Sequence, residues 1–158
     1  MQVYFAKLIK NKKMIVETLI NLEKSKAKKK NNFTKAINIL WVDDEIEFLK
    51  PHIIFLSQNG YVVNTASNGL DAIQEVSKQH YDIIFMDENM PGLSGIETIS
   101  RIKEINSNIP VVMVTKNETE GNMKEATKNH VVDYLVKPVS MTQIFDVAHK
   151  ILNSTKSF

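Results

Sequence analysis

The sequence predicts an α/β fold in which a doubly wound, five-stranded parallel sheet has helices on both faces. Two observations support this prediction. Five short apolar runs alternate with stretches whose apolar residues recur every three or four positions, as in amphipathic helices. The runs are continuously apolar, which is typical of parallel strands buried on both faces. With 158 residues, 43% of them hydrophobic, the chain is long enough for one such domain and too short for two of ordinary size.

The composition excludes several classes of site. The chain contains no cysteine, which rules out disulfides, thiolate catalysis and thiolate metal ligands. Lysine is abundant, but 19 Lys against a single Arg indicate AT-rich coding bias more than selection for nucleic-acid binding. The charge is uneven: residues 1–36 hold ten Lys against two Glu, a net charge of +8, whereas residues 37–158 have a net charge of −6.

Residues 1–36 are predicted to form a basic N-terminal extension that is partly helical or disordered. A basic amphipathic helix could span residues 3–22, ahead of a lysine run at 24–30. Charged residues interrupt the apolar stretches, so we expect no signal peptide and no transmembrane segment, which fits a cytoplasmic protein. Three interpretations stay open: a solvated extension, an arm that binds membrane surfaces or nucleic acid, or an artefact of an upstream start codon.

The first predicted strand is the run INILWV at 37–42, and it ends at three consecutive acids, Asp43, Asp44 and Glu45. Apolar residues at helical spacing follow, until Asn59 and Gly60 end the pattern. Pro51 lies inside this stretch and lacks the backbone N–H that a helix interior needs. The helix is therefore expected either to start near Lys50 or to be kinked.

The second and third strands frame a capped helix. The run YVVNTA at 61–66 is the second strand, and Asn68 is a candidate N-cap for a helix that ends near Gln79. The third strand, at 83–86, consists of four apolar residues and stops abruptly at Asp87. Turn residues follow, so this strand is expected to present one carboxylate at an edge of the sheet.

The fourth strand also follows a capped helix. Ser94 and Glu97 form a capping-box pattern at the start of that helix, which the sequence breaks at 106–110. The run VVMV at 111–114 is the fourth strand, and it ends at Thr115.

The last third of the chain contains a weak helix, a strand and a strong helix. The helix expected at 118–129 has few apolar residues, and the fifth strand at 133–136 ends at Lys137. Ser140 and Gln143 form a second capping box ahead of the clearest apolar stripe in the chain, Ile144, Val147, Ala148, Ile151 and Leu152. After it we expect only a tail, residues 154–158, and no output domain.

Polar residues stand at the ends of four strands, and the carboxyl ends of parallel strands are where such folds bind ligands. We therefore expect five side chains to converge there: Asp43, Asp44, Asp87, Thr115 and Lys137. Three carboxylates in one cleft repel one another unless a cation is bound, and Mg²⁺ prefers oxygen ligands. The chain has no glycine-rich nucleotide-binding motif, so a phosphoryl group is expected on the protein itself, as an aspartyl-phosphate.

These motifs together resemble the receiver domain of bacterial two-component response regulators. The resemblance rests on the paired acids after the first strand in ILWVDDE, the DENMPG that starts at Asp87, Thr115 after the fourth strand, and YLVKP at 134–138. It covers residues 37–153. It implies the flavodoxin-like strand order 2-1-3-4-5. Trp41 and the string DENMPGL are further similar to PorX-type regulators associated with type IX secretion.

The resemblance implies a role for each motif residue. Asp87 would be the phosphoacceptor, and Lys137 would bind the phosphoryl group. Thr115 and Tyr134 would be the switch pair, and the peptide bond before Pro138 would be cis. The implied Mg²⁺ ligands are Asp43 (mainly through water), Asp44, Asp87 and the main-chain carbonyl of Asn89. Glu88 is interpreted as a loop residue whose amide matters more than its carboxylate.

The implied function is a phosphorylation-dependent signalling switch that catalyses its own phosphorylation and dephosphorylation without being an enzyme in the usual sense. A sensor histidine kinase would donate the phosphoryl group, within a phosphorelay. A downstream effector or output region outside this chain would respond, and a homodimer could form through the fourth helix, fifth strand and fifth helix. We expect no nucleic-acid binding by the receiver itself.

Two alternatives and one departure accompany this interpretation. An Mg²⁺-dependent phosphatase would need a second acid-base carboxylate just beyond the nucleophile, where Asn89 stands. A pseudo-receiver that only binds partners would not need the complete set of acids, Thr115 and Lys137.

The departure from the family pattern is Lys116, because a small residue usually follows the switch threonine. We predict that its long side chain partly covers the site and slows phosphoryl exchange.

Overall fold

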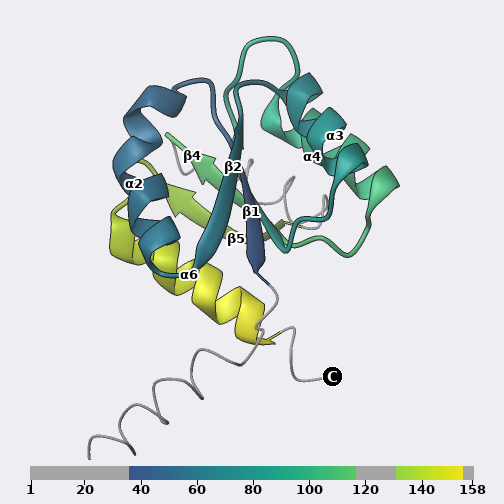
Figure 1. Ribbon diagram of the computed structural model, residues 1–158. Helices are drawn as coiled ribbons and strands as arrows, with labels where there is room; N and C mark the ends of the chain where they lie inside the picture. Colours follow the sequence, from purple (N-terminus) through teal and green to yellow (C-terminus); the bar gives the residue numbers. More distant parts are fainter. Residues whose placement is uncertain (1–35, 117–130, 155–158) are drawn as a thin grey trace, which may run out of the picture. The chain divides into compact units, whose positions relative to one another are not determined.

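The computed structural model of the chain describes residues 36–116 and 131–154. Its five strands form one parallel sheet in the order β2-β1-β3-β4-β5, which confirms the expected topology (Figure 1). Each strand is a short apolar run, as the sequence predicts. The strands are β1 (Ile37–Val42), β2 (Tyr61–Ala66), β3 (Ile83–Asp87), β4 (Val111–Thr115) and β5 (Val131–Val136).

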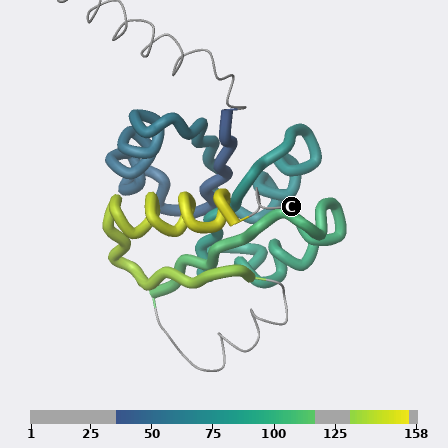
Figure 2. The backbone as a smooth tube through the Cα atoms, turned by 90° about the horizontal axis from the view of Figure 1, so that it is seen from below, coloured from purple at the N-terminus to yellow at the C-terminus, as the bar shows by residue number. Residues whose placement is uncertain are grey.

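Helices cover both faces of this sheet. The described helices are α2 (Ile46–Gln58), α3 (Gly69–Lys78), α4 (Gly95–Ile105) and α6 (Met141–Ser154). Figure 1 shows α3 and α4 on one side of the sheet and α2 and α6 on the other. In Figure 2, α2 (blue) lies next to α6 (yellow), and the rings of Phe55 and Phe145 meet edge to face between them, with centroids 6.1 Å apart.

The core consists of two clusters of buried apolar side chains, one on each face of the sheet. Successive residues of a strand point to opposite faces, so the central strands contribute to both clusters. In β1, Leu40 packs with residues of α3 and α4, whereas the neighbouring Trp41 packs with residues of α2 and α6. Each fully buried side chain of this size contributes roughly 1.5–3 kcal/mol. This double-sided burial is why the strands are continuously apolar.

Side-chain caps begin three helices where the sequence predicts them. The Asn68 side chain accepts a hydrogen bond from the Asp71 N–H at 2.9 Å. Both capping boxes form: one at the start of α4, and one in which the Ser140 N–H donates to the Gln143 side chain at 2.9 Å. Each such cap is worth about 1 kcal/mol. The caps therefore fix where α3, α4 and α6 begin.

Helix α2 differs from the prediction at its start. It begins at Ile46 and contains Pro51 in its sixth position, so the alternative that placed its start near Lys50 is wrong. The proline ring is exposed, and packing of the apolar face of α2 against the sheet outweighs the missing backbone donor. At its other end, Gly60 adopts a φ of 89°, a conformation that favours glycine.

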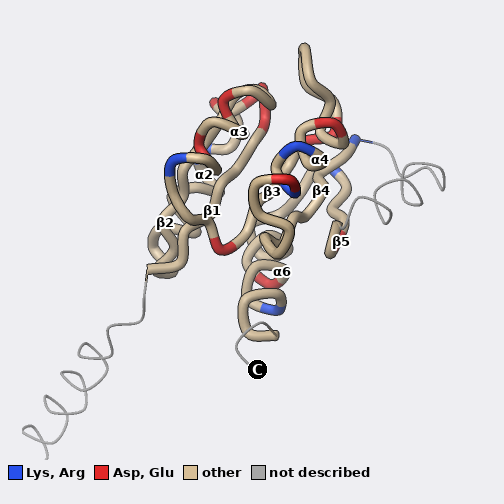
Figure 3. Tube along the Cα trace, turned by 90° about the vertical axis from the view of Figure 1, so that its right-hand side faces the viewer, with Lys and Arg blue, Asp and Glu red and all other residues tan. Residues whose placement is uncertain are grey.

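Charged residues lie mainly in the helices and near strand ends (Figure 3), and most of them are exposed. Several form exposed ion pairs, such as Lys78 with Glu75 at 3.2 Å within α3 and Lys150 with Asp133 at 3.4 Å between α6 and β5. Exposed pairs contribute only about 0–1 kcal/mol each. The stability of the fold therefore rests on the apolar clusters.

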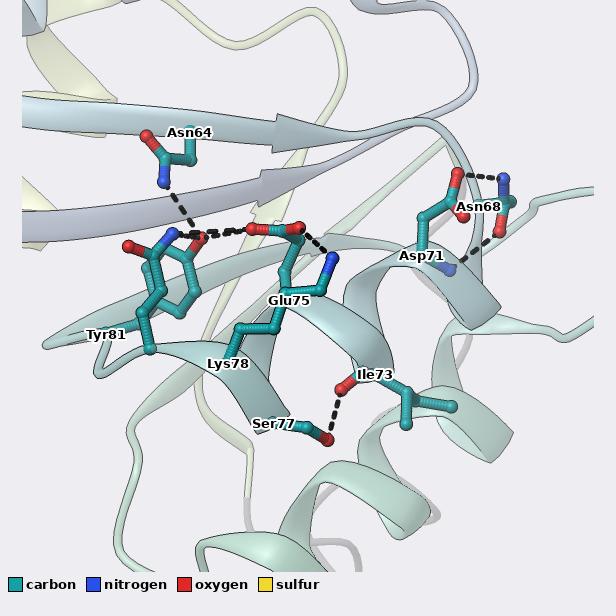
Figure 4. Close-up of polar contacts among 9 residues, drawn as sticks. Asn64, Asn68, Asp71, Ile73, Glu75, Ser77, Lys78 and Tyr81 are labelled. Carbon is teal, nitrogen blue, oxygen red and sulfur yellow. Dashed lines mark hydrogen bonds and ion pairs between the residues drawn. The ribbon is translucent and has the colours of Figure 1, made fainter.

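A polar network ties β2, α3 and the entry to β3 together (Figure 4). Tyr81 is 1% exposed, and its hydroxyl accepts a hydrogen bond from Asn64 at 3.0 Å and donates one to Glu75 at 3.2 Å. Burial is the main reason why the pKa of the Tyr81 hydroxyl is raised. This network satisfies a buried phenol far from the acidic end of the sheet, so we assign it a structural role.

Several predictions fall outside the described residues. These are the expected helices at 3–22 and 118–129, nearly all of the basic extension, and the end of the tail. Within the described part, β3 and β4 each include the polar residue expected to follow them, and β5 begins two residues earlier than predicted. None of the helices in residues 36–116 and 131–154 is long and apolar enough to cross a membrane.

Candidate functional site

Four adjacent strands bring polar side chains to the carboxyl edge of the sheet. Asp87 and Thr115 are the last residues of β3 and β4. Asp43 follows β1 directly, and Lys137 follows β5. Because β1 pairs with β3, β3 with β4, and β4 with β5, these four residues are side by side at one edge.

Three carboxylates meet at this edge. Asp43, Asp44 and Asp87 each offer one oxygen, and these oxygens lie within 4.8 Å of one another. Asp43 and Asp87 are each 1% exposed, whereas Asp44 is exposed. Among the described residues, the buried Oδ1 of Asp87 receives no hydrogen bond. A cluster made only of oxygen donors, with one buried oxygen unsatisfied, suits a hard divalent cation.

Lys137 supplies the positive charge beside two of these acids. Its ammonium lies 2.8 Å from Asp43 Oδ2 and 3.2 Å from Asp87 Oδ1, the second contact being an ion pair outside hydrogen-bonding geometry. Burial is the largest influence on the pKa of Lys137 and lowers it, but the two carboxylates together outweigh burial and raise that pKa. The side chain is therefore a permanent cation at this site.

The Asp87 carboxyl group has a raised pKa. Burial is the main cause, and the negative charges of Asp43 and Asp44 add to it, while Lys137 opposes them. A buried carboxylate of raised pKa is poorly solvated and correspondingly basic. This is the character that a carboxylate nucleophile needs, provided that cations offset its charge.

Thr115 contacts an acid that the sequence analysis did not assign to the site. Its hydroxyl donates a hydrogen bond to the Glu88 carboxylate. Glu88 directly follows β3, and its own N–H donates to the Val114 carbonyl at 3.1 Å. The side chain of Glu88, and not only its amide, therefore belongs to this site. No sequence signal reveals this contact, because it depends on how two neighbouring strand ends align.

An ion pair spans the outer rim of the site. The ammonium of Lys116, just after β4, lies 3.4 Å from the Glu45 carboxylate in the loop after β1. Both side chains are exposed. The pair connects the loops that follow β1 and β4, the two strands that flank β3 in the sheet.

The two remaining predicted residues lie at different depths. Asn89 is exposed in the loop two residues after Asp87. Tyr134 is half-buried in β5, opposite Met113 of β4, and packs against the cluster under α3 and α4. The Lys137–Pro138 peptide bond is cis, as predicted.

The first residue of α4 packs directly against the backbone of Asp87 and Glu88. Gly95 is its first residue, and the Gly95 N–H donates to the Glu88 carbonyl at 2.9 Å. A Cβ atom at Gly95 would lie 2.3 Å from the Asp87 carbonyl oxygen. Only glycine allows this approach, which fixes the end of β3 against the start of α4.

A cavity of about 430 Å³ adjoins the acids on the side of α2 and α6. Asp43 and Lys137 line it together with mainly apolar residues, including Trp41. His52 also lines it and is 2.8 Å from the Val139 carbonyl through Nε2. Within the described residues, Trp41 Nε1 and His52 Nδ1 have no hydrogen-bond partner.

Comparisons with known proteins identify the family of this chain. A family model described as the response regulator receiver domain matches residues 39–149. The transcriptional regulatory protein ZraR of Klebsiella oxytoca is 35% identical over 110 residues, which are 70% of this chain and 25% of ZraR. The sporulation initiation phosphotransferase F of Bacillus subtilis (strain 168) is 32% identical over 116 residues, covering 72% of this chain and 92% of that protein. The chain spans about a quarter of the length of the ZraR relatives that it matches.

Solved structures give the same result. The chemotaxis protein CheY4 of Vibrio cholerae superposes with a TM-score of 0.70 and 25% identity, over 73% of this chain and 98% of that one. The fold, the acidic end of the sheet and the sequence relatives thus agree. With the family model matching well over half of its length, the chain belongs to the response regulator receiver domain family of two-component signalling.

Proposed function

We propose that the chain is a phosphorylation-dependent signalling switch in which Asp87 receives a phosphoryl group from a sensor histidine kinase. One observation supports this most strongly: the Asp87 carboxylate is buried, has an oxygen that no donor among residues 36–116 and 131–154 hydrogen-bonds, and lies close to the Lys137 ammonium and two further acids. Such a carboxylate is both a nucleophile and part of a cation site.

The residues that would hold Mg²⁺ are the three clustered acids and the main-chain carbonyl of Asn89. Asp44 and Asp87 would bind it directly, and Asp43 mainly through water. Bound there, Mg²⁺ would offset the negative charge of the phosphoryl oxygens. The choice of Mg²⁺ follows from the oxygen-only donor set and from the preference of this ion for carboxylates combined with a phosphate.

In the transfer step, an Asp87 oxygen attacks the phosphorus of a phosphohistidine on the kinase. The P–N bond breaks, and its electron pair goes to the imidazole nitrogen, which then takes up a proton. Lys137, whose ammonium lies 3.2 Å from Asp87 Oδ1, is the cation available to the phosphoryl oxygens. Hydrolysis of the acyl phosphate by water would return Asp87 to its original state.

The signal would then pass through Thr115 and Tyr134. The Thr115 hydroxyl turns to the phosphoryl group, Tyr134 changes rotamer, and the surface around β5 and α6 changes its affinity for a partner. That partner is an effector or output region outside this sequence, or a second copy that binds through the segment 118–129, β5 and α6. The identity of this partner would decide whether the chain acts as a PorX-type regulator or in another signalling pathway.

The remaining assignments follow from charge and family. Residues 37–158 have a net charge of −6, which disfavours nucleic-acid binding by the receiver itself. We propose a cytoplasmic location, which suits partnership with the histidine kinase of a phosphorelay.

Labelling with acetyl phosphate and Mg²⁺ tests the proposal directly. Intact-mass measurement should show one added phosphoryl group on the wild type and none on Asp87→Asn. An unlabelled wild type would refute the phosphoacceptor role and favour a phosphorylation-independent binding module. Release of phosphate over many turnovers would instead favour the phosphatase alternative.

A further inference from the structure

The end of β4 holds its threonine in a specific orientation. The Thr115 hydroxyl donates to the carboxylate of Glu88, a residue to which the sequence and the family resemblance assign no side-chain role. A hydroxyl has a single hydrogen to donate. While Glu88 accepts that hydrogen, the hydroxyl cannot donate it to a group on Asp87.

The backbone around Glu88 is fixed on two sides. Its N–H donates to the Val114 carbonyl at 3.1 Å, and its carbonyl accepts from the Gly95 N–H at 2.9 Å. Thr115 is 1% exposed, which makes its hydroxyl costly to leave without an acceptor. The contact thus joins two anchored residues.

We propose that Glu88 is a positioning residue that holds the Thr115 hydroxyl in the unphosphorylated orientation and so opposes switching. This inference rests on the proposed role of Thr115. A phosphoryl group on Asp87 must displace the Glu88 carboxylate as acceptor before Thr115 reaches it. Glu88 thereby shifts the equilibrium of the unphosphorylated protein toward the inactive state.

Two substitutions separate this hydrogen bond from the charge of Glu88. Glu88→Gln removes the negative charge but keeps an oxygen that can accept from Thr115, whereas Glu88→Ala removes both. Glu104→Gln is the matched control, because it removes the same charge from an exposed position on α4. Both Glu88 variants keep the backbone hydrogen bonds of this residue, and thermal unfolding would check that all four proteins fold.

The measurement is the affinity for beryllofluoride, a phosphoryl mimic, in the presence of Mg²⁺, followed by fluorine NMR. We expect Glu88→Ala to bind it roughly three- to tenfold more tightly than wild type, the range that loss of one competing hydrogen bond gives. The affinity of Glu88→Gln for beryllofluoride should lie between those of wild type and Glu88→Ala, and the affinity of Glu104→Gln should match that of wild type. Equal tightening in Gln and Ala would attribute the effect to charge and overturn the proposal, as would no change in either variant.

A second measurement needs no phosphoryl mimic. Three-bond couplings to the labelled Thr115 side chain report its χ1 rotamer in the unmodified protein. Glu88→Ala should change the rotamer populations and Glu88→Gln should change them less; identical populations in all proteins would overturn the proposal. A wild type that binds no beryllofluoride would refute the phosphorylation switch itself, and the Thr115 rotamer would then decide separately whether Glu88 positions this residue.

Discussion

The environment of Asp87 disfavours the negatively charged form of its carboxyl group. Burial raises the pKa of this group most strongly, and the neighbouring acids add to that effect against the opposing influence of Lys137. A group with a raised folded-state pKa binds more protons in the folded than in the unfolded chain. Stability therefore falls as pH rises from the ordinary Asp pKa of about 3.9 through the raised value.

At neutral pH, Asp87→Asn should consequently have a higher free energy of unfolding than wild type, because the amide avoids this loss. The difference should shrink as pH falls, and it should vanish below about pH 3.9, where the wild-type carboxyl is protonated in both states. Urea unfolding of both proteins across this range, without divalent cations, measures the effect. A wild type as stable as the variant at neutral pH would contradict the expectation.

The rim formed by Lys116 and Glu45 should control access of small donors. Lys116→Ala is expected to increase the rate of labelling by acetyl phosphate roughly 1.4- to fivefold, which corresponds to the ~0.2–1 kcal/mol of an exposed ion pair. Glu45→Gln should act in the same direction if the pair holds Lys116 in place. An unchanged rate in Lys116→Ala would refute the covering role.

At this scale the sequence predicts positions better than contacts. Asp43, Asp87 and Thr115 could be found because each interrupts an apolar strand at its carboxyl end. The Thr115–Glu88 and Lys116–Glu45 contacts could not be found. They depend on side-chain rotamers and on the relative height of loops that are distant in sequence, and neither leaves a pattern in the residues themselves.

Among the elements, β3 and α4 meet at a junction where the backbones approach closely. Gly95→Ala would place a methyl group 2.3 Å from the Asp87 carbonyl oxygen, a backbone atom that cannot move without shifting the end of β3. We expect a loss of roughly 1–3 kcal/mol in stability, as for other overpacked sites, together with slower labelling of Asp87.

Gly69→Ala is the comparison for this prediction. Its added methyl group would meet the Thr98 side chain on α4 and not the backbone of the site. It should lower stability as well, yet retain a labelling rate close to wild type. Thermal unfolding and acetyl-phosphate labelling of both variants would separate the two effects, and equal labelling rates would show that the approach of Gly95 to Asp87 has no chemical importance.

Helix and strand types followed from periodicity, and helix starts followed from caps, but α2 shows where local rules fail. Pro51 argues locally against a helix that begins at Ile46, yet packing of the apolar side of α2 against the sheet outweighs the missing donor. The free energy of such tertiary packing exceeds local helix propensity, and it cannot be judged from the residues of one segment alone.

For the molecule as a whole, the fold could be predicted because its two-sided sheet imposes a uniform pattern on every central strand. The same architecture brings acids from β1 and β3 together only when the chain is folded. A cation that binds the cluster must therefore stabilise the folded state.

Mg²⁺ should thus raise the free energy of unfolding, by about 2.7 kcal/mol when its free concentration is 100 times its Kd. Asp44→Asn is the appropriate control, because Asp44 is exposed and its replacement leaves the core intact. Thermal unfolding with Mg²⁺, against a potassium salt of equal ionic strength, measures the gain. The same gain in Asp44→Asn would place the cation elsewhere.

The intrinsic fluorescence of Trp41 can report on events at the acidic site. It is the only tryptophan in the chain and is 1% exposed, and it lines the same cavity as Asp43 and Lys137. Indole emission responds to nearby charge and polarity, so its intensity should change when cations bind or Asp87 gains a phosphoryl group. Stopped-flow fluorescence could then time kinase transfer and decay in real time, without any dye or engineered probe.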